Sequence, residues 1–133
     1  MKSESITMSA TIAAAPKAIY DAWMSSKGHT AMTGSPAAVT AKVGGKYTAW
    51  DGYISGTTLE LEPGKRILQS WRSTDFAREA PDSRLEVLLA AVKGGTKVTL
   101  KHSDFPPGGA AEYKKGWKDF YFAPMKKHFA QGK

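Results

Sequence analysis

The sequence AAEYKKGWKDFYFAPMKKHFA, residues 110–130, decides the fold. It reads as one long helix with a broad apolar arc, because large side chains gather within about 100° when residues are plotted at 100° each. These side chains are Tyr113, Trp117, Phe120, Tyr121, Pro124 and His128. A flat sheet covers less of a helix than this arc requires, so we expect a curved sheet gripping the helix. Pro124 removes one backbone hydrogen bond and predicts a kink near Phe120.

The residues before this helix alternate between apolar and polar, which is typical of half-buried antiparallel strands. In the first such segment Ile6, Met8 and Ile12 share one face. Further strands are predicted over residues 46–51, 53–62, 66–73, 85–92 and 96–103, separated by turns at Asp51-Gly52, Pro63-Gly64 and Gly94-Gly95.

Two short helical segments are expected directly after the first strand. Pro16 suits the first position of a helix, and Ile19, Ala22 and Trp23 follow at helical spacing. A second helical turn is predicted over residues 26–32.

This order of elements indicates an α+β fold, because strands follow one another in a run between helices. We predict a curved antiparallel sheet of about six to seven strands around the long C-terminal helix, with one or two short helices after the first strand. The chain has 133 residues, which suits one core, so residues 1–133 are expected to form a single domain.

Composition excludes several classes of site and location. The chain has no Cys, which rules out disulfides, thiolate zinc sites and a Cys nucleophile. The N-terminus lacks the apolar run of a signal peptide, and no stretch approaches the roughly 20 apolar residues of a membrane span. We therefore expect a cytoplasmic location without membrane association.

The positive charge is concentrated near the C-terminus. Of the net charge of +7, residues 93–133 contribute nine Lys against three acidic residues. Such a surface can attract an acidic partner. It contains no Arg and no interleaved aromatic platform, so a solvated helix face is the favoured interpretation and nucleic acid is not an expected partner.

Four ordered segments resemble the family named for the activator of heat-shock protein 90 ATPase. They are Val43–Tyr47 (VGGKY), Trp50–Gly56 (WDGYISG), Leu59–Arg72 (LELEPGKRILQSWR) and Gly116–Lys126 (GWKDFYFAPMK). The resemblance covers nearly the whole chain, from Ile6 to Phe129, and implies the helix-grip fold of the START-like, Bet v-like (SRPBCC) superfamily. The eukaryotic co-chaperone has two domains, and this chain resembles the C-terminal one. The Asn- and Trp-rich motif of the other domain, tied to ATPase stimulation, has no counterpart here.

The helix-grip fold implies a cavity between the sheet and the long helix. The alternation of the strands and the periodicity of the helices supply candidates for its lining, which are Trp23, Met32, Trp71, Val87, Leu89, Leu100, His102, Trp117, Phe120 and Tyr121. A mostly apolar cleft with a few polar tips is the usual small-ligand site. The alternative is that these side chains fill the interior completely.

The sequence contains no recognisable catalytic or metal-binding set. A Gly-x-Ser-x-Gly motif is absent, and His29, His102 and His128 lack the spacing of metal ligands. We predict no metal, no cofactor and no catalytic residue. His102 is the one candidate for a polar anchor or acid–base group at the cavity mouth, although a partly exposed histidine hydrogen-bonded to a neighbour is the favoured interpretation.

These features favour a noncatalytic binding domain for a small hydrophobic ligand or a protein partner, with a link to stress response. One alternative is a co-chaperone-like regulator of a chaperone ATPase. The other is a cyclase- or aromatase-like enzyme that uses the cavity. The sequence is compatible with a monomer or a dimer.

Overall fold

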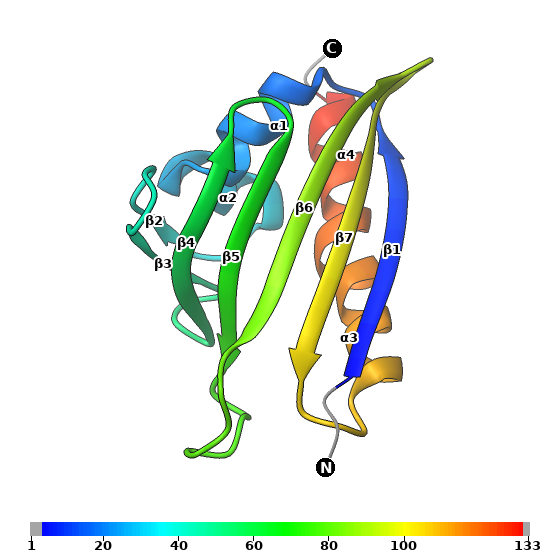
Figure 1. The fold of residues 1–133 in the computed structure, drawn as a ribbon. Helices are drawn as coiled ribbons and strands as arrows, with labels where there is room; N and C mark the ends of the chain where they lie inside the picture. Colours follow the sequence, from blue (N-terminus) through cyan, green and yellow to red (C-terminus); the bar gives the residue numbers. More distant parts are fainter. Residues whose placement is uncertain (1–3, 132–133) are drawn as a thin grey trace.

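The computed structural model describes residues 4–131, and in them a seven-stranded antiparallel sheet curves around the C-terminal helical segment (Figure 1). The spatial order is β1-β7-β6-β5-β4-β3-β2, so the first strand pairs with the last. The strands are β1 (Glu4–Ile12), β2 (Ala38–Val39), β3 (Lys46–Ala49), β4 (Ile54–Glu62), β5 (Arg66–Ser73), β6 (Ser83–Val92) and β7 (Gly95–Phe105). The predicted α+β helix-grip fold is confirmed.

Two short helices follow β1, as predicted: α1 (Pro16–Trp23) and α2 (Ser26–Thr33). Pro16 occupies the first turn of α1. The Ser25 side chain caps α2 by accepting a hydrogen bond from the amide of Gly28 at 2.9 Å.

The C-terminal segment is one continuous rod built from three parts: α3 (Ala110–Trp117), a π-helical turn η1 (Lys118–Phe122) and α4 (Ala123–Gln131). In η1 the amide of Ala123 bonds the carbonyl of Lys118, five residues back. Pro124 has no amide hydrogen for an ordinary helical bond to Phe120, which accounts for the irregularity just before it. The predicted kink near Phe120 is therefore a π-helical turn.

The π-helical turn corrects one expectation about the helix. Phe120 was predicted on the inward face, but its side chain is 56% exposed, whereas Tyr121 and Phe122 are buried. The wheel at 100° per residue fails here because η1 places more residues in its turn than an α-helix does.

No helix among the described residues has the length and apolar character needed to span a membrane.

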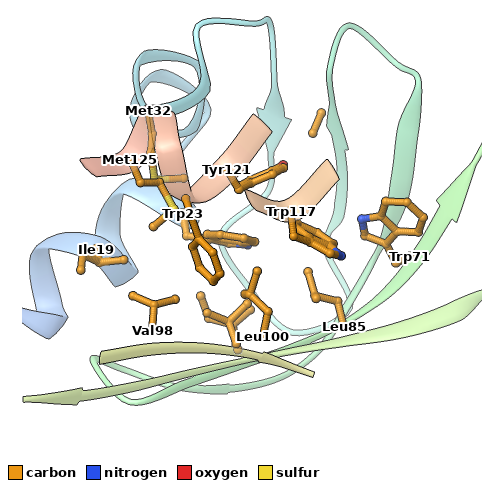
Figure 2. Packing of buried hydrophobic residues seen from close by; sticks show 14 of the residues in the cluster. Ile19, Trp23, Met32, Trp71, Leu85, Val98, Leu100, Trp117, Tyr121 and Met125 are labelled. Carbon is orange, nitrogen blue, oxygen red and sulfur yellow. The ribbon is translucent and has the colours of Figure 1, made fainter. Parts of the chain in front are cut away.

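The core lies between the concave face of the sheet and the helices. In Figure 2 Trp117, Tyr121 and Met125 of the C-terminal segment lie across the core from Val98 and Leu100 of the sheet. Nine of the ten predicted interior positions are buried, and they are Trp23, Met32, Trp71, Val87, Leu89, Leu100, His102, Trp117 and Tyr121. They form the packed core of the domain.

A buried polar contact joins α1 to the sheet. The Trp23 indole N–H donates to Gln69 Oε1 at 3.3 Å, and Gln69 Nε2 donates to Thr58 Oγ1 at 3.2 Å. Gln69 shares a face of β5 with Ile67 and Trp71, and all three are buried. Because each polar group has a partner, the amide is buried without an unsatisfied donor.

Trp117→Ala should lower the free energy of unfolding by about 3–5 kcal/mol, because it deletes a large ring that is 4% exposed in the core. Phe120→Ala is the matched control on the same segment and should cost less than about 1 kcal/mol, since Phe120 lies largely in solvent. Urea unfolding followed by circular dichroism measures both. Equal costs would show that the segment is rotated relative to the sheet.

Candidate functional site

An open groove of about 510 Å³ lies where the C-terminal segment meets the far half of the sheet. The turn between β3 and β4 forms one wall, the end of β5 forms the floor, and α3 with η1 forms the other wall. Aromatic rings dominate its lining, and they are Trp50, Tyr53, Trp71, Tyr113, Trp117, Phe120 and Tyr121. The remaining lining residues are Ile54, Ser73, Asp75, Gly109, Glu112 and Gly116.

The floor of the groove is a set of touching rings. The centroids of Trp71 and Trp117 lie 5.9 Å apart, and those of Trp117 and Tyr121 lie 4.8 Å apart. Tyr113 meets Trp71 edge-on at 5.7 Å. These separations are typical of favourable aromatic pairs, so the floor is a packed apolar surface.

One lip of the groove is a strained turn. Trp50 and Asp51 have φ of 54° and 56°, in the left-handed region that side chains rarely adopt. The amide of Asp51 bonds the carbonyl of Pro36 at 2.9 Å and holds this conformation. The turn places the Trp50 ring against Phe120 with centroids 5.5 Å apart. Residues held in such sparsely populated backbone conformations cluster at functional sites.

Behind the floor, a chain of hydrogen bonds joins the helix to three strands. The Trp117 indole N–H donates to His102 Nδ1 at 3.2 Å, and Ser83 Oγ donates to the Trp71 carbonyl at 2.8 Å. His102 Nε2 lies 2.8 Å from Ser83 Oγ. Because Nδ1 accepts, His102 is neutral and carries its proton on Nε2, which donates to Ser83.

His102 is therefore part of the core and not a group at the cavity mouth. The favoured interpretation of a hydrogen bond to a neighbour is confirmed, but the expected partial exposure is wrong, because the side chain is fully buried. Burial lowers its pKa to about 3. Both ring nitrogens are occupied, so the imidazole presents no acid or base to the groove.

A second buried pair anchors η1 to α2. The Tyr121 hydroxyl donates to His29 Nε2 at 2.8 Å, while His29 Nδ1 donates to the Trp23 carbonyl at 3.0 Å. Burial raises the pKa of Tyr121 and lowers that of His29, so both groups are neutral near pH 7.

The structure divides the predicted cavity residues into two groups. Trp71, Trp117, Phe120 and Tyr121 line the groove, whereas the other predicted positions are core or lie behind the floor. Sequence reasoning missed Trp50 and Tyr53 as lining residues. The signal that could have found them is the pair of large rings flanking the Asp51-Gly52 turn.

Within residues 4–131, no group of three or more His, Asp or Glu side chains lies close enough together to hold a metal ion.

Comparisons with known proteins settle the family. A sequence model described as "Activator of Hsp90 ATPase homolog 1-like protein" matches residues 13–130. The chain belongs to this family. Human activator of 90 kDa heat shock protein ATPase homolog 1 is 27% identical over 127 residues, which cover 96% of this chain and 37% of the human protein. The Dictyostelium discoideum homologue is 25% identical over 103 residues, covering 77% of this chain and 27% of that protein. This chain thus spans little more than a third of the human relative.

Solved structures share the fold over 95% or more of this chain. An HSP90 activator from Plasmodium falciparum superposes with a TM-score of 0.80 at 27% identity, covering 95% of this chain and 94% of that one. The Aha1 dimer from Colwellia psychrerythraea gives 0.79 at 19% identity, with 95% and 96% coverage. DynU16, from the dynemicin biosynthetic locus, gives 0.80 at 18% identity and covers 97% of this chain and 48% of that one.

Stability should fall as the pH drops below 6.5, because the unfolded chain protonates His102 at its ordinary pKa of 6.5 while the folded chain does so only near 3. The loss attributable to His102 should reach about 3 kcal/mol by pH 4.5. His102→Gln, whose amide can donate to Ser83 and accept from Trp117, should flatten this slope. His128→Gln at the end of α4 is the control and should leave it unchanged. Parallel slopes for His102→Gln and wild type in urea unfolding between pH 7 and 4.5 would contradict the buried neutral imidazole.

Proposed function

We propose that the chain is a noncatalytic binding domain that holds a small, flat, apolar ligand in the aromatic groove. The observation that carries this proposal is the convergence of seven rings around an open volume of about 510 Å³. Small-molecule sites are typically about 300–1,000 Å³ and lined in this way. At the mouth, the rings of Tyr53 and Phe120 are 45% and 56% exposed, which leaves apolar surface for a ligand to cover.

The polar groups near the floor support binding over catalysis. His102 is bonded to Trp117 and Ser83, and Tyr121 to His29. A cyclase- or aromatase-like enzyme would need a polar group free to act on its substrate. The deep polar atoms beside this groove are occupied by one another, so the enzyme alternative draws no support from them.

Flat aromatic compounds should raise the melting temperature of the protein by roughly 5–10 °C at about 100 times their dissociation constant. Trp50→Ala and Phe120→Ala should each remove most of this shift, because they delete the lip that covers the ligand. Val43→Ala is the control, since Val43 is exposed elsewhere on the surface. Differential scanning fluorimetry with a panel of aromatic compounds and fatty acids measures the shifts. If no compound in the panel raises the melting temperature of the wild type or of Val43→Ala, the small-ligand proposal is wrong.

A second candidate function is contact with an Hsp90-type chaperone, in keeping with a role in stress response. It is favoured by the family and by 27% identity to an HSP90 activator from Plasmodium falciparum over nearly the whole chain. We propose that the contact uses the exposed lysines of the C-terminal segment. These are Lys114, Lys115, Lys118, Lys126 and Lys127.

The chaperone contact should appear in a pull-down at low salt and weaken at higher salt, because exposed charges are screened. Replacing Lys126 and Lys127 with Glu should abolish it. Lys42→Glu, an exposed lysine in the loop between β2 and β3, is the control and should retain it. A chaperone ATPase assay provides the functional readout. If the chain neither binds the chaperone nor changes its ATPase rate, this proposal is wrong. That result would leave the proposal of a ligand in the groove unaffected.

A further inference from the structure

The charge at the groove is opposite in sign to the charge of the protein. Among the described residues, the charged side chains that line the groove are Asp75 and Glu112, both acidic. The chain as a whole carries +7. An acidic aromatic groove on a basic protein is therefore a local feature that the overall composition does not explain.

The two carboxylates act on the tyrosines at the mouth. The Tyr53 hydroxyl donates a hydrogen bond to Asp75 Oδ2. Burial raises the pKa of Tyr113, and the nearby charges of Asp75 and Glu112 raise it further. The hydroxyl groups of Tyr53 and Tyr113 therefore interact electrostatically with the two carboxylates at the groove entrance.

Asp75 is held in place and keeps one oxygen available. Its amide donates to Ser73 Oγ at 3.0 Å, which fixes the backbone, and Tyr53 engages Oδ2. Within the described part of the chain, Oδ1 of Asp75 and the carboxylate of Glu112 make no hydrogen bond or ion pair. Two carboxylates without a cation partner, beside aromatic rings, make a negative site that a ligand cation can neutralise.

A second hollow of the molecule shows the opposite character. It has about 390 Å³ on the outer face of the sheet, and its charged lining is Arg66, Arg84 and Lys101 against Glu86 alone. There Arg66 is already paired with Glu60 and Glu86. The lining of that hollow is net positive, like the whole protein, whereas the lining of the aromatic groove is net negative.

We propose that the groove selects a small organic cation, namely a molecule with a flat aromatic body and an amine or quaternary ammonium group. This inference rests on the proposed function and narrows the ligand class. The flat body lies on the Trp71–Trp117 floor beneath the lip of Trp50 and Phe120. The cation lies at the mouth, where tyrosine faces and carboxylates both attract positive charge.

The same residues disfavour a ligand that carries a negative charge or no charge. An anionic ligand in this groove would face Asp75 and Glu112 without a lysine or arginine in the lining. A neutral aromatic molecule would bind the floor and leave the carboxylates without a partner. Because the long-range field of a +7 protein attracts anions, any preference for a cation must come from the groove itself.

Three naphthalene probes with matched bodies test the proposal: (naphthalen-2-ylmethyl)trimethylammonium, 2-(methoxymethyl)naphthalene and naphthalene-2-acetate. Titration with tryptophan fluorescence, supported by calorimetry, gives the dissociation constants. The cation should bind roughly tenfold more tightly than the neutral probe, and the anion should bind most weakly. The combined variant Asp75→Asn and Glu112→Gln should reduce the cation's advantage to about twofold or less. Glu79→Gln, an exposed acid outside the groove lining, is the control and should preserve it.

The outcomes separate this inference from the proposed function. If all three probes bind with equal affinity, and Trp50→Ala weakens them equally, the groove is a ligand site but cation selection is refuted. If the anion binds most tightly, the field of the whole protein dominates and the inference is also refuted. If no probe binds, both the proposed function and the inference fail.

Discussion

The Trp117 indole donates its N–H to His102, and this bond fixes where the C-terminal segment lies on the sheet. A buried donor left without an acceptor costs about 1–3 kcal/mol, so the bond strongly restricts the position of the helix. From His102 the chain continues through Ser83 to the carbonyl of Trp71, crossing β7, β6 and β5. Because Trp71 and Trp117 stand at its two ends, the same bonds also set the spacing of the groove floor. Fold and candidate site thus depend on one neutral imidazole.

The π-helical turn is the second constraint, and it decides which rings reach the groove. Pro124 cannot donate a backbone hydrogen bond, and the widened turn before it directs Phe120 toward solvent while Tyr121 stays buried. In a regular helix both would compete for the interior. The widened turn instead gives the groove a lip from Phe120 and a wall from Tyr121, and Trp50 meets Phe120 from the opposite side.

The alternation of the strands, the Pro16 helix start and the family segments were sufficient to predict the fold and most of the core. The site could be predicted only in part, for reasons that lie in geometry. The contact between Ser83 and His102 follows from the register that pairs Leu85 with His102, and strand patterns do not determine that register. Phe120 points outward because of the π-helical turn, whereas a helical wheel assumes a constant angle between successive residues. The left-handed backbone at Trp50 is rare enough that no propensity predicts it.

The two proposed binding surfaces share a single structural element. On α3, Tyr113 and Trp117 face the groove while Lys114 and Lys115 are exposed, and in η1 Lys118 is followed closely by Phe120. Both Lys118 and Phe120 lie in η1, where the backbone bond from Ala123 to Lys118 spans five residues. A ligand that repacks Phe120 therefore acts on the same turn that carries Lys118. Occupancy of the acidic groove and contact through the lysines would be linked through this turn, so the two activities need not be independent even though their charges are opposite.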